Sequence, residues 1–141
     1  MPDLRLPPGS VIGILGGGQL GRMTALAAAR LGYQCHIFDP EPGGPAAQVA
    51  SAQTNAAYDD HDALDRFAAT IDVATYEFEN IPVDSIDHLL KRVPVRPGPK
   101  VLATAQDRVV EKAFLDSIDV PIAPHGEVQD VAGLARAAAK I

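Results

Sequence analysis

The chain has 141 residues, 47% of them hydrophobic, and its 18 acidic against 12 basic residues give a formal net charge of −6. This length suffices for one domain with a real core, and the acidic balance excludes a general nucleic-acid binder, which needs a basic face. The single cysteine, Cys35, excludes an intramolecular disulfide framework, and neither a signal-peptide core nor an apolar run of membrane-spanning length is present, so we expect a cytoplasmic protein without membrane contact.

Strand and helix patterns alternate along most of the chain, after an N-terminal tail at residues 1–10. Short apolar runs predict strands at 11–15, 34–39, 52–58, 73–77 and 93–96. Between them, alanine- and leucine-rich or acid-capped segments predict helices at 19–31, 46–51, 60–70 and 82–92. This β-α-β alternation predicts an α/β domain over residues 11–98, a doubly wound parallel sheet covered on both faces.

The character of the chain changes at the proline-glycine-proline sequence of residues 97–99. Residues 101–116 are expected to be helical, a proline-bearing linker follows, and residues 129–141 begin another helix in which the chain stops. We therefore expect residues 99–141 to be a linker helix and the incomplete beginning of a second domain.

A glycine-rich turn follows the first strand, because Gly16 to Gly21 fit the pattern G-x-G-x-x-G. Glycines allow the backbone to turn tightly and to approach a ligand, and the following helix offers unpaired N–H groups to an anion. Asp39 ends the second strand at 18 residues beyond Gly21, near the spacing of an acid that holds an NAD ribose. A dinucleotide, a nucleotide monophosphate and a purely structural turn are all compatible with this motif.

Four motifs in this order resemble one family: GGGQLGRM (16–23), FDPEPGGPA (38–46), YEFEN (76–80) and QDRVVEK (106–112). The family is that of the 5-(carboxyamino)imidazole ribonucleotide synthases, which are ATP-grasp ligases of purine biosynthesis. The resemblance implies a Rossmann-like preATP-grasp domain at 11–98, followed by the start of an ATP-grasp domain. It also implies that the backbone N–H groups of Gly18, Gln19 and Leu20 bind the ribonucleotide phosphate, that Glu77 hydrogen-bonds the ribonucleotide, and that Arg108 faces the ATP phosphates.

The family joins bicarbonate to aminoimidazole ribonucleotide through carboxyphosphate, with ATP and Mg²⁺, and its members are commonly homodimers. We assign no catalytic residue and no metal ligand within this chain, because the family's ATP-covering loop and magnesium acids lie beyond Ile141. We therefore expect the 141 residues alone to be catalytically inactive.

Plainer interpretations stand beside these assignments. Glu77 and Glu79 fit edge acids of a strand, Arg108 fits a surface ion pair, and Cys35 fits a buried, inert thiol. The alternative functions are a formate-dependent glycinamide ribonucleotide transformylase, which typically has Glu-Leu where this chain has Gln19-Leu20, an NAD-binding Rossmann domain, and a non-catalytic ribonucleotide-binding module.

Overall fold

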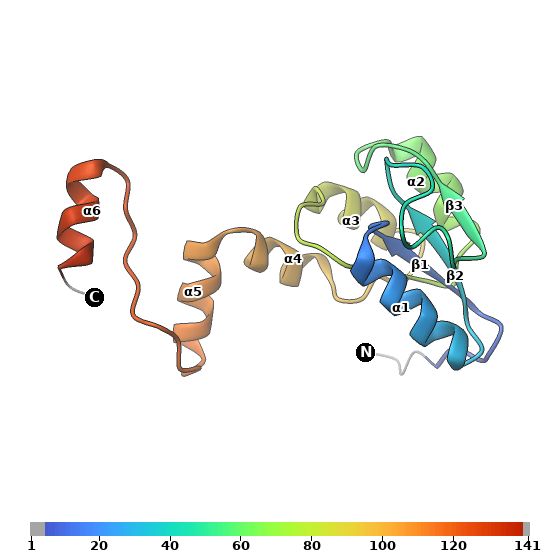
Figure 1. Ribbon diagram of the computed structural model, residues 1–141, viewed down its shortest axis with the longest axis horizontal. Coiled ribbons are helices and arrows are strands. Elements are labelled where there is room, and N and C mark those ends of the chain that lie inside the picture. Colours follow the sequence, from blue (N-terminus) through green and yellow to red (C-terminus); the bar gives the residue numbers. More distant parts are fainter. Residues whose placement is uncertain (1–4, 140–141) are drawn as a thin grey trace. The chain divides into compact units, whose positions relative to one another are not determined.

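The computed structural model describes residues 5–139, which form two compact units, one ending at Leu102 and the other beginning at Ala103. The first unit contains a parallel sheet with the strand order β3-β2-β1-β4. Its strands are β1 (Val11–Leu15), β2 (Gln34–Phe38), β3 (Ala52–Thr54) and β4 (Val73–Tyr76), and its helices include α1 (Gln19–Arg30), α2 (His61–Ala68) and α3 (Val83–Leu90). Figure 1 shows α1 on one face of the sheet and α2 with α3 on the other. The predicted α/β class with a parallel sheet is confirmed.

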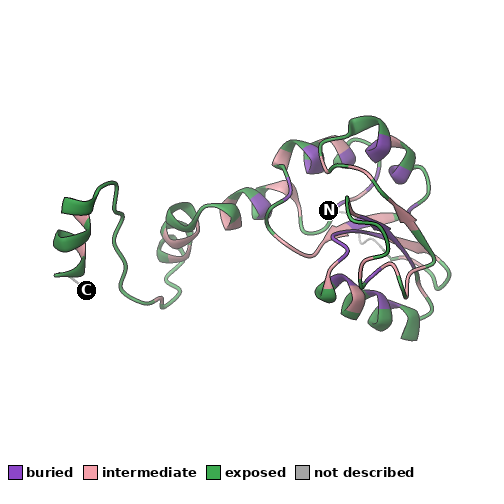
Figure 2. Cartoon of the chain, turned by 45° about the horizontal axis from the view of Figure 1, so that its top comes forward, coloured by how far each residue is buried: buried purple, intermediate pink, exposed green. Residues whose placement is uncertain are grey.

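Successive residues of the central strands serve opposite faces of the sheet, as the two-residue period of a strand requires. Ile14 and Ile37 pack with residues of α1 in one buried cluster, whereas Leu15 and Phe38 pack with α2 and α3 in the other. Burial on both faces explains why these strands are continuous apolar runs rather than alternating ones. In Figure 2 the buried residues accordingly lie along the strands and on parts of the three helices.

For the segment between β2 and α2, the predicted helix is wrong and the predicted strand is confirmed over a shorter range. No helix forms at 46–51: Val49 and Ala50 both donate to the Ala46 carbonyl, but the N–H of Ser51 turns to the Cys35 carbonyl of β2, so the segment makes a single turn. The strand predicted at 52–58 ends at Thr54, because its partner strand β2 ends at Phe38.

The strand predicted at 93–96 is also wrong, since only one bridge, between Val95 and Ala74, extends the sheet beyond β4. Pro94 lies within this stretch and has no N–H to give to a ladder. The single helix predicted at 101–116 is divided into α4 (Pro99–Gln106) and α5 (Arg108–Ser117), because Asp107 caps α5 by accepting from the N–H groups of Val109 and Val110.

The other predicted elements are confirmed to within two or three residues where the structure describes them. The last helix, α6 (Val131–Ala138), lies inside the range predicted at 129–141, of which residues 140–141 are outside the described part. In the described part of the predicted tail, the Tyr33 hydroxyl donates to the Leu6 carbonyl and the Gly9 N–H donates to the Gly32 carbonyl, so this stretch packs on the α1–β2 connection. Between residues 5 and 139, no helix has both the length and the apolar character of a membrane span.

Candidate functional site

Three carboxyl ends of strands meet at one edge of the sheet. Leu15, the last residue of β1, is in register with Phe38 of β2 and with Tyr76 of β4. The residues that follow these ends therefore come together, although they are far apart in the sequence. Because β1 has β2 on one side and β4 on the other, the chain reverses its winding direction here, which is where open α/β sheets bind ligands.

The glycine turn after β1 is held by carboxylates from the two neighbouring strands. The Gly17 N–H donates to Asp39 Oδ2 at 2.6 Å, and the Gly18 N–H donates to Glu77 Oε1 at 3.2 Å. Gly16 has a φ of +116°, and a Cβ there would lie 2.3 Å from Glu77 Cγ. The turn thus needs glycine both for its backbone conformation and for the close approach of Glu77.

Helix α1 begins directly after this turn with an unsatisfied N-terminus. Its hydrogen-bond ladder starts with the Arg22 N–H, which donates to the Gly18 carbonyl at 3.0 Å. Among the residues that the structure describes, none accepts from the backbone N–H of Gln19 or Leu20. The first turn also contains no acidic side chain. Free N–H groups and the positive end of the helix dipole together favour an anion at this point.

The connection between β2 and β3 packs on the turn and forms one wall of a cavity. The Ala46 N–H donates to the Gly17 carbonyl at 2.9 Å, and the Arg22 guanidinium donates to the Pro45 carbonyl and to Gln48 Oε1 at 3.0 and 2.8 Å. Arg22 therefore links α1 to this connection by hydrogen bonds. The cavity has a volume of about 230 Å³ and is lined by Gly17, Gly18, Asp39, Glu41, Gly44, Pro45, Glu77 and Phe78.

The structure brings together most of the residues proposed from the sequence. Gly18 and Glu77 are in direct contact, and Gln19 and Leu20 stand at the open end of α1 beside them. Arg108 belongs to the second unit, where it forms an ion pair with Glu111 and its side chain is 74% exposed. This ion pair on the surface is what the alternative interpretation of Arg108 predicted from the sequence.

Sequence reasoning missed Tyr58, which reaches the site by donating to Asp39 Oδ2 at 2.8 Å. Burial, its hydrogen bond to Asp39 and the charges of Asp39 and Glu77 raise the pKa of Tyr58 far above the ordinary range, so the phenol stays protonated. The only sequence signal was a tyrosine at the end of an expected strand, which does not specify a partner.

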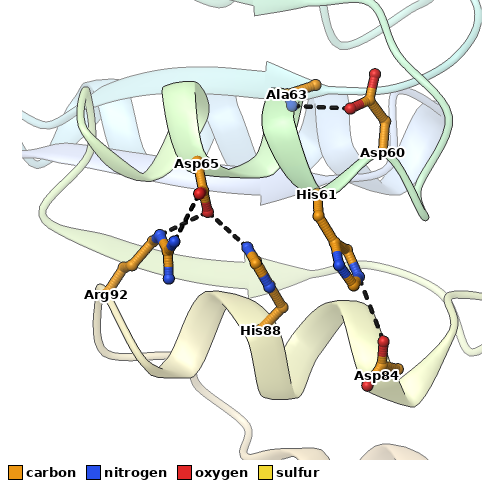
Figure 3. Close-up of polar contacts among 7 residues, drawn as sticks. All are labelled: Asp60, His61, Ala63, Asp65, Asp84, His88 and Arg92. Carbon is orange, nitrogen blue, oxygen red and sulfur yellow. Dashed lines mark hydrogen bonds and ion pairs between the residues drawn. The ribbon is translucent and has the colours of Figure 1, made fainter.

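A second polar cluster joins α2 to α3, as Figure 3 shows. The rings of His61 and His88 stack with centroids 4.2 Å apart, and His88 Nε2 lies 2.5 Å from Asp65 Oδ1. His61 Nε2 lies 3.3 Å from Asp84, and Arg92 donates to Asp65 Oδ2 at 2.5 Å. Among residues 5–139, this cluster and the remaining His, Cys, Asp and Glu side chains form no group of three or more suited to a metal ion. Cys35 is buried, and burial raises the pKa of its thiol.

The second unit has a larger cavity of its own, about 800 Å³, between α6 and the segment that precedes it. Its walls are mostly exposed residues, including His125, Asp130 and Arg136, and no described residue of α5 or α6 is buried. Figure 2 shows the same absence of buried positions along these two helices. An open, weakly packed space of this kind has less of a built site than the smaller cavity at the glycine turn.

Comparison with known proteins identifies the family to which the chain is similar. The profile of the ribonucleotide synthetase preATP-grasp domain matches residues 10–106. A bifunctional purine synthesis protein of Dictyostelium discoideum is 54% identical over 98% of this chain and 14% of its own length, and the N5-carboxyaminoimidazole ribonucleotide synthase of Brucella melitensis is 53% identical over 92% and 36%. Apart from the much longer Dictyostelium protein, the chain spans about a third of the length of the curated relatives it matches.

Solved structures that resemble this chain are of enzymes with the same name as most of these relatives. An N5-carboxyaminoimidazole ribonucleotide synthetase in complex with ADP superposes with a TM-score of 0.89 and 41% identity, covering 99% of this chain and 37% of that one. The enzyme of Aspergillus clavatus, in complex with ADP and 5-aminoimidazole ribonucleotide, gives a TM-score of 0.82 at 28% identity, covering 94% and 36%.

Proposed function

Because the chain belongs to the ribonucleotide synthetase preATP-grasp family, we propose that it supplies the ribonucleotide-binding part of an ATP-dependent ligase that carboxylates 5-aminoimidazole ribonucleotide. The observation that carries this proposal is the open N-terminus of α1 beside the Glu77 carboxylate, at the edge where three strands end. An anion-binding helix end next to a hydrogen-bond acceptor matches a ligand with both a phosphate and hydroxyl or amino groups.

We assign the phosphate to the N–H groups of Gln19 and Leu20. The Gly18 N–H, which the family resemblance also gave to the phosphate, is instead bound by a carboxylate of the protein, and Gly18 serves as part of the turn. Gly18 donates to Glu77 Oε1 in the structure, so Glu77 links the phosphate-binding turn to the rest of the ligand. Its second oxygen, Oε2, would accept a hydrogen bond from the ribonucleotide. One carboxylate would thus position both the turn and the substrate.

In the proposed reaction, ATP phosphorylates bicarbonate to carboxyphosphate, and the exocyclic amine of the ribonucleotide takes up the carboxyl group as phosphate leaves. The contribution of this chain is to hold the amine-bearing substrate in place and to exclude water around it. Arg108, with its exposed guanidinium in the second unit, would face the ATP phosphates. Mg²⁺ would neutralise charge on the ATP phosphates, and within residues 5–139 no group of three or more His, Cys, Asp or Glu side chains is suited to hold it.

The alternative of an NAD-binding Rossmann domain is disfavoured by Asp39. In dinucleotide sites the acid after the second strand accepts from a ribose hydroxyl. Here Oδ2 of Asp39 accepts from Gly17 and Tyr58, and Oδ1 accepts from the Glu41 N–H at 2.8 Å, so both oxygens are engaged within the protein. The transformylase alternative has less support, because the Brucella relative and the two solved structures named above are carboxyaminoimidazole ribonucleotide synthases.

The proposal extends to a cytoplasmic location, to a homodimer of the full-length ligase, and to the absence of nucleic-acid and membrane binding. The net charge of −6 supports the first of these exclusions. Light scattering coupled to size-exclusion chromatography measures the oligomeric state directly, and a monomer at every accessible concentration would contradict the dimer.

Isothermal titration of the chain with 5-aminoimidazole ribonucleotide tests the binding proposal. We expect saturable 1:1 binding, competition by inorganic phosphate at high concentration, and much weaker binding of glycinamide ribonucleotide and NAD. Binding of NAD without binding of either ribonucleotide would overturn the assignment in favour of a dinucleotide domain.

A further inference from the structure

The Asp39 carboxylate joins three segments of the first unit. It accepts from the Gly17 N–H of the glycine turn at 2.6 Å and from the Tyr58 hydroxyl at 2.8 Å, both through Oδ2. Through Oδ1 it accepts from the Glu41 N–H at 2.8 Å, which closes a turn two residues further along its own segment. A substitution of Asp39 would therefore remove hydrogen bonds at the glycine turn, at the wall of the cavity and at Tyr58.

Tyr58 holds this carboxylate from a rigid position. Its ring lies 6.1 Å from that of Phe38, which is fully buried in the core, and 5.5 Å from that of Phe78, which lines the cavity. The tyrosine side chain is half-buried, and burial and the neighbouring carboxylates raise the pKa of Tyr58, so the hydroxyl remains a donor at any physiological pH. A packed ring with a permanent donor determines where Asp39 Oδ2 lies.

The two peptide groups on either side of Gly17 are consequently fixed in orientation. The N–H of the first peptide is bound by Asp39, and the carbonyl of the second accepts from Ala46 at 2.9 Å. The second peptide also carries the Gly18 N–H, which donates to Glu77. These peptides immediately precede Gln19, so their orientation sets the direction in which the first N–H groups of α1 point.

We propose that Asp39 and Tyr58 are a pair of positioning residues that hold the glycine turn in the conformation that binds the phosphate of the ribonucleotide. This inference rests on the proposed function for the identity of the ligand. Neither residue needs to touch the phosphate, because Asp39 acts through the backbone of Gly17 and Tyr58 acts through Asp39. Preorganised N–H groups bind an anion more tightly than groups that must be ordered on binding.

The variants Tyr58→Phe and Asp39→Asn, alone and combined, test the pair in the full chain. Tyr58→Phe removes only the hydroxyl, and we expect about fivefold weaker binding of 5-aminoimidazole ribonucleotide, the effect of one ordinary hydrogen bond. Tyr58 acts only through Asp39, so the effects of the two substitutions should not add. The dissociation constant of the double variant should therefore be no higher than that of the single variant with the higher dissociation constant. Tyr33→Phe is the matched control: it also removes one hydroxyl that donates to an acceptor in the first unit, the Leu6 carbonyl, and its affinity should equal that of the unchanged chain.

The Gly17 amide gives a local readout when its exchange is compared with that of the other backbone amides of the first unit, because a general loss of stability speeds the exchange of all of them. In ¹⁵N–¹H spectra of the chain, we expect the Gly17 amide proton to move upfield in Asp39→Asn, and to exchange faster with solvent in Tyr58→Phe than in Tyr33→Phe. If Tyr58→Phe changes neither the exchange rate of the Gly17 amide nor the affinity for the ribonucleotide, the positioning role is wrong. This comparison does not need Asp39→Asn, so it still tests the proposal if that variant does not fold. If the unchanged chain does not bind the ribonucleotide, the proposed function fails, while the Gly17 measurement still decides whether the pair holds the turn.

Discussion

Glu77 lies against the glycine turn, and its Oε1 accepts a hydrogen bond from the Gly18 N–H at 3.2 Å. The two residues are 59 positions apart, and they meet because β1 and β4 are adjacent parallel strands whose ends are in register. The position of Glu77 also leaves no room for a side chain at Gly16, where a Cβ would lie 2.3 Å from Glu77 Cγ.

Replacing Glu77 with glutamine should weaken ribonucleotide binding without unfolding the chain. Glutamine keeps an acceptor for the Gly18 N–H but removes the charge that we assign to the ligand. Hydrogen bonds to charged groups contribute about 1.5–3 kcal/mol, so we expect the dissociation constant in isothermal titration to rise by about tenfold to a hundredfold. Glu127→Gln, an exposed change in the second unit, should have no effect. If the two variants bind the ribonucleotide with equal affinity, Glu77 does not contact the ligand.

The substitution Gly16→Ala should destabilise the first unit. Gly16 has a φ of +116°, which is strained for alanine, and the added Cβ would lie 2.3 Å from Glu77 Cγ. We expect a loss of about 1–3 kcal/mol in the free energy of unfolding by urea. Gly98→Ala is the control, because a Cβ there meets nothing within 4 Å and its φ lies outside the left-handed region. A Gly16→Ala chain as stable as the Gly98→Ala chain would show that the turn is not constrained as described.

His36 should make stability fall with acidification between pH 7 and pH 5. Burial lowers the pKa of His36 from its ordinary value of 6.5, and its ring contacts the hydroxyls of Thr70 and Thr54 at 2.9 Å. The folded state thus binds fewer protons than the unfolded state in this window, so the free energy of unfolding decreases as the pH falls through 6.5 toward the depressed pKa. The contribution is at most about 1.4 kcal/mol per pH unit. His36→Gln should flatten this slope, and a slope that this substitution leaves unchanged would refute the assignment.

Asp65 should contribute to stability at neutral pH and lose that contribution in acid. Its partial desolvation acts to raise its pKa, but hydrogen bonds from His88 and Arg92 and their charges together lower the pKa below its ordinary 3.8. The stabilisation is therefore complete above that value and disappears as the pH falls through the lower pKa of the folded state. In urea unfolding, Asp65→Asn should be less stable than the unchanged chain at pH 7, and this difference should shrink as the pH falls below 3.8. Asp87→Asn on α3 is exposed and should match the stability of the unchanged chain at pH 7; the same result for Asp65→Asn would contradict the role of this cluster.

Local patterns were sufficient for the elements whose own residues determine them. A few adjacent residues are enough to indicate the apolar strand β1, the glycine turn after it and the alanine-rich helix α1. All three were predicted correctly. The failures at 46–51 and 93–96 came where a neighbouring strand or a missing proline N–H decided the hydrogen bonds. The stacking of His61 on His88 had no sequence signal, because it depends on how α2 packs against α3.

The sequence by itself therefore determined the α/β class, the glycine turn at the end of β1, and the family, because these depend on short motifs and on the order of elements. Only the tertiary structure decided what the acids at the strand ends do. Asp39 and Glu77 are both acids that follow a strand of the parallel sheet. Asp39 has both oxygens engaged within the protein, whereas Glu77 lines the cavity and has one oxygen on Gly18. The difference comes from strand register and from Tyr58, a contact between residues that no local pattern connects.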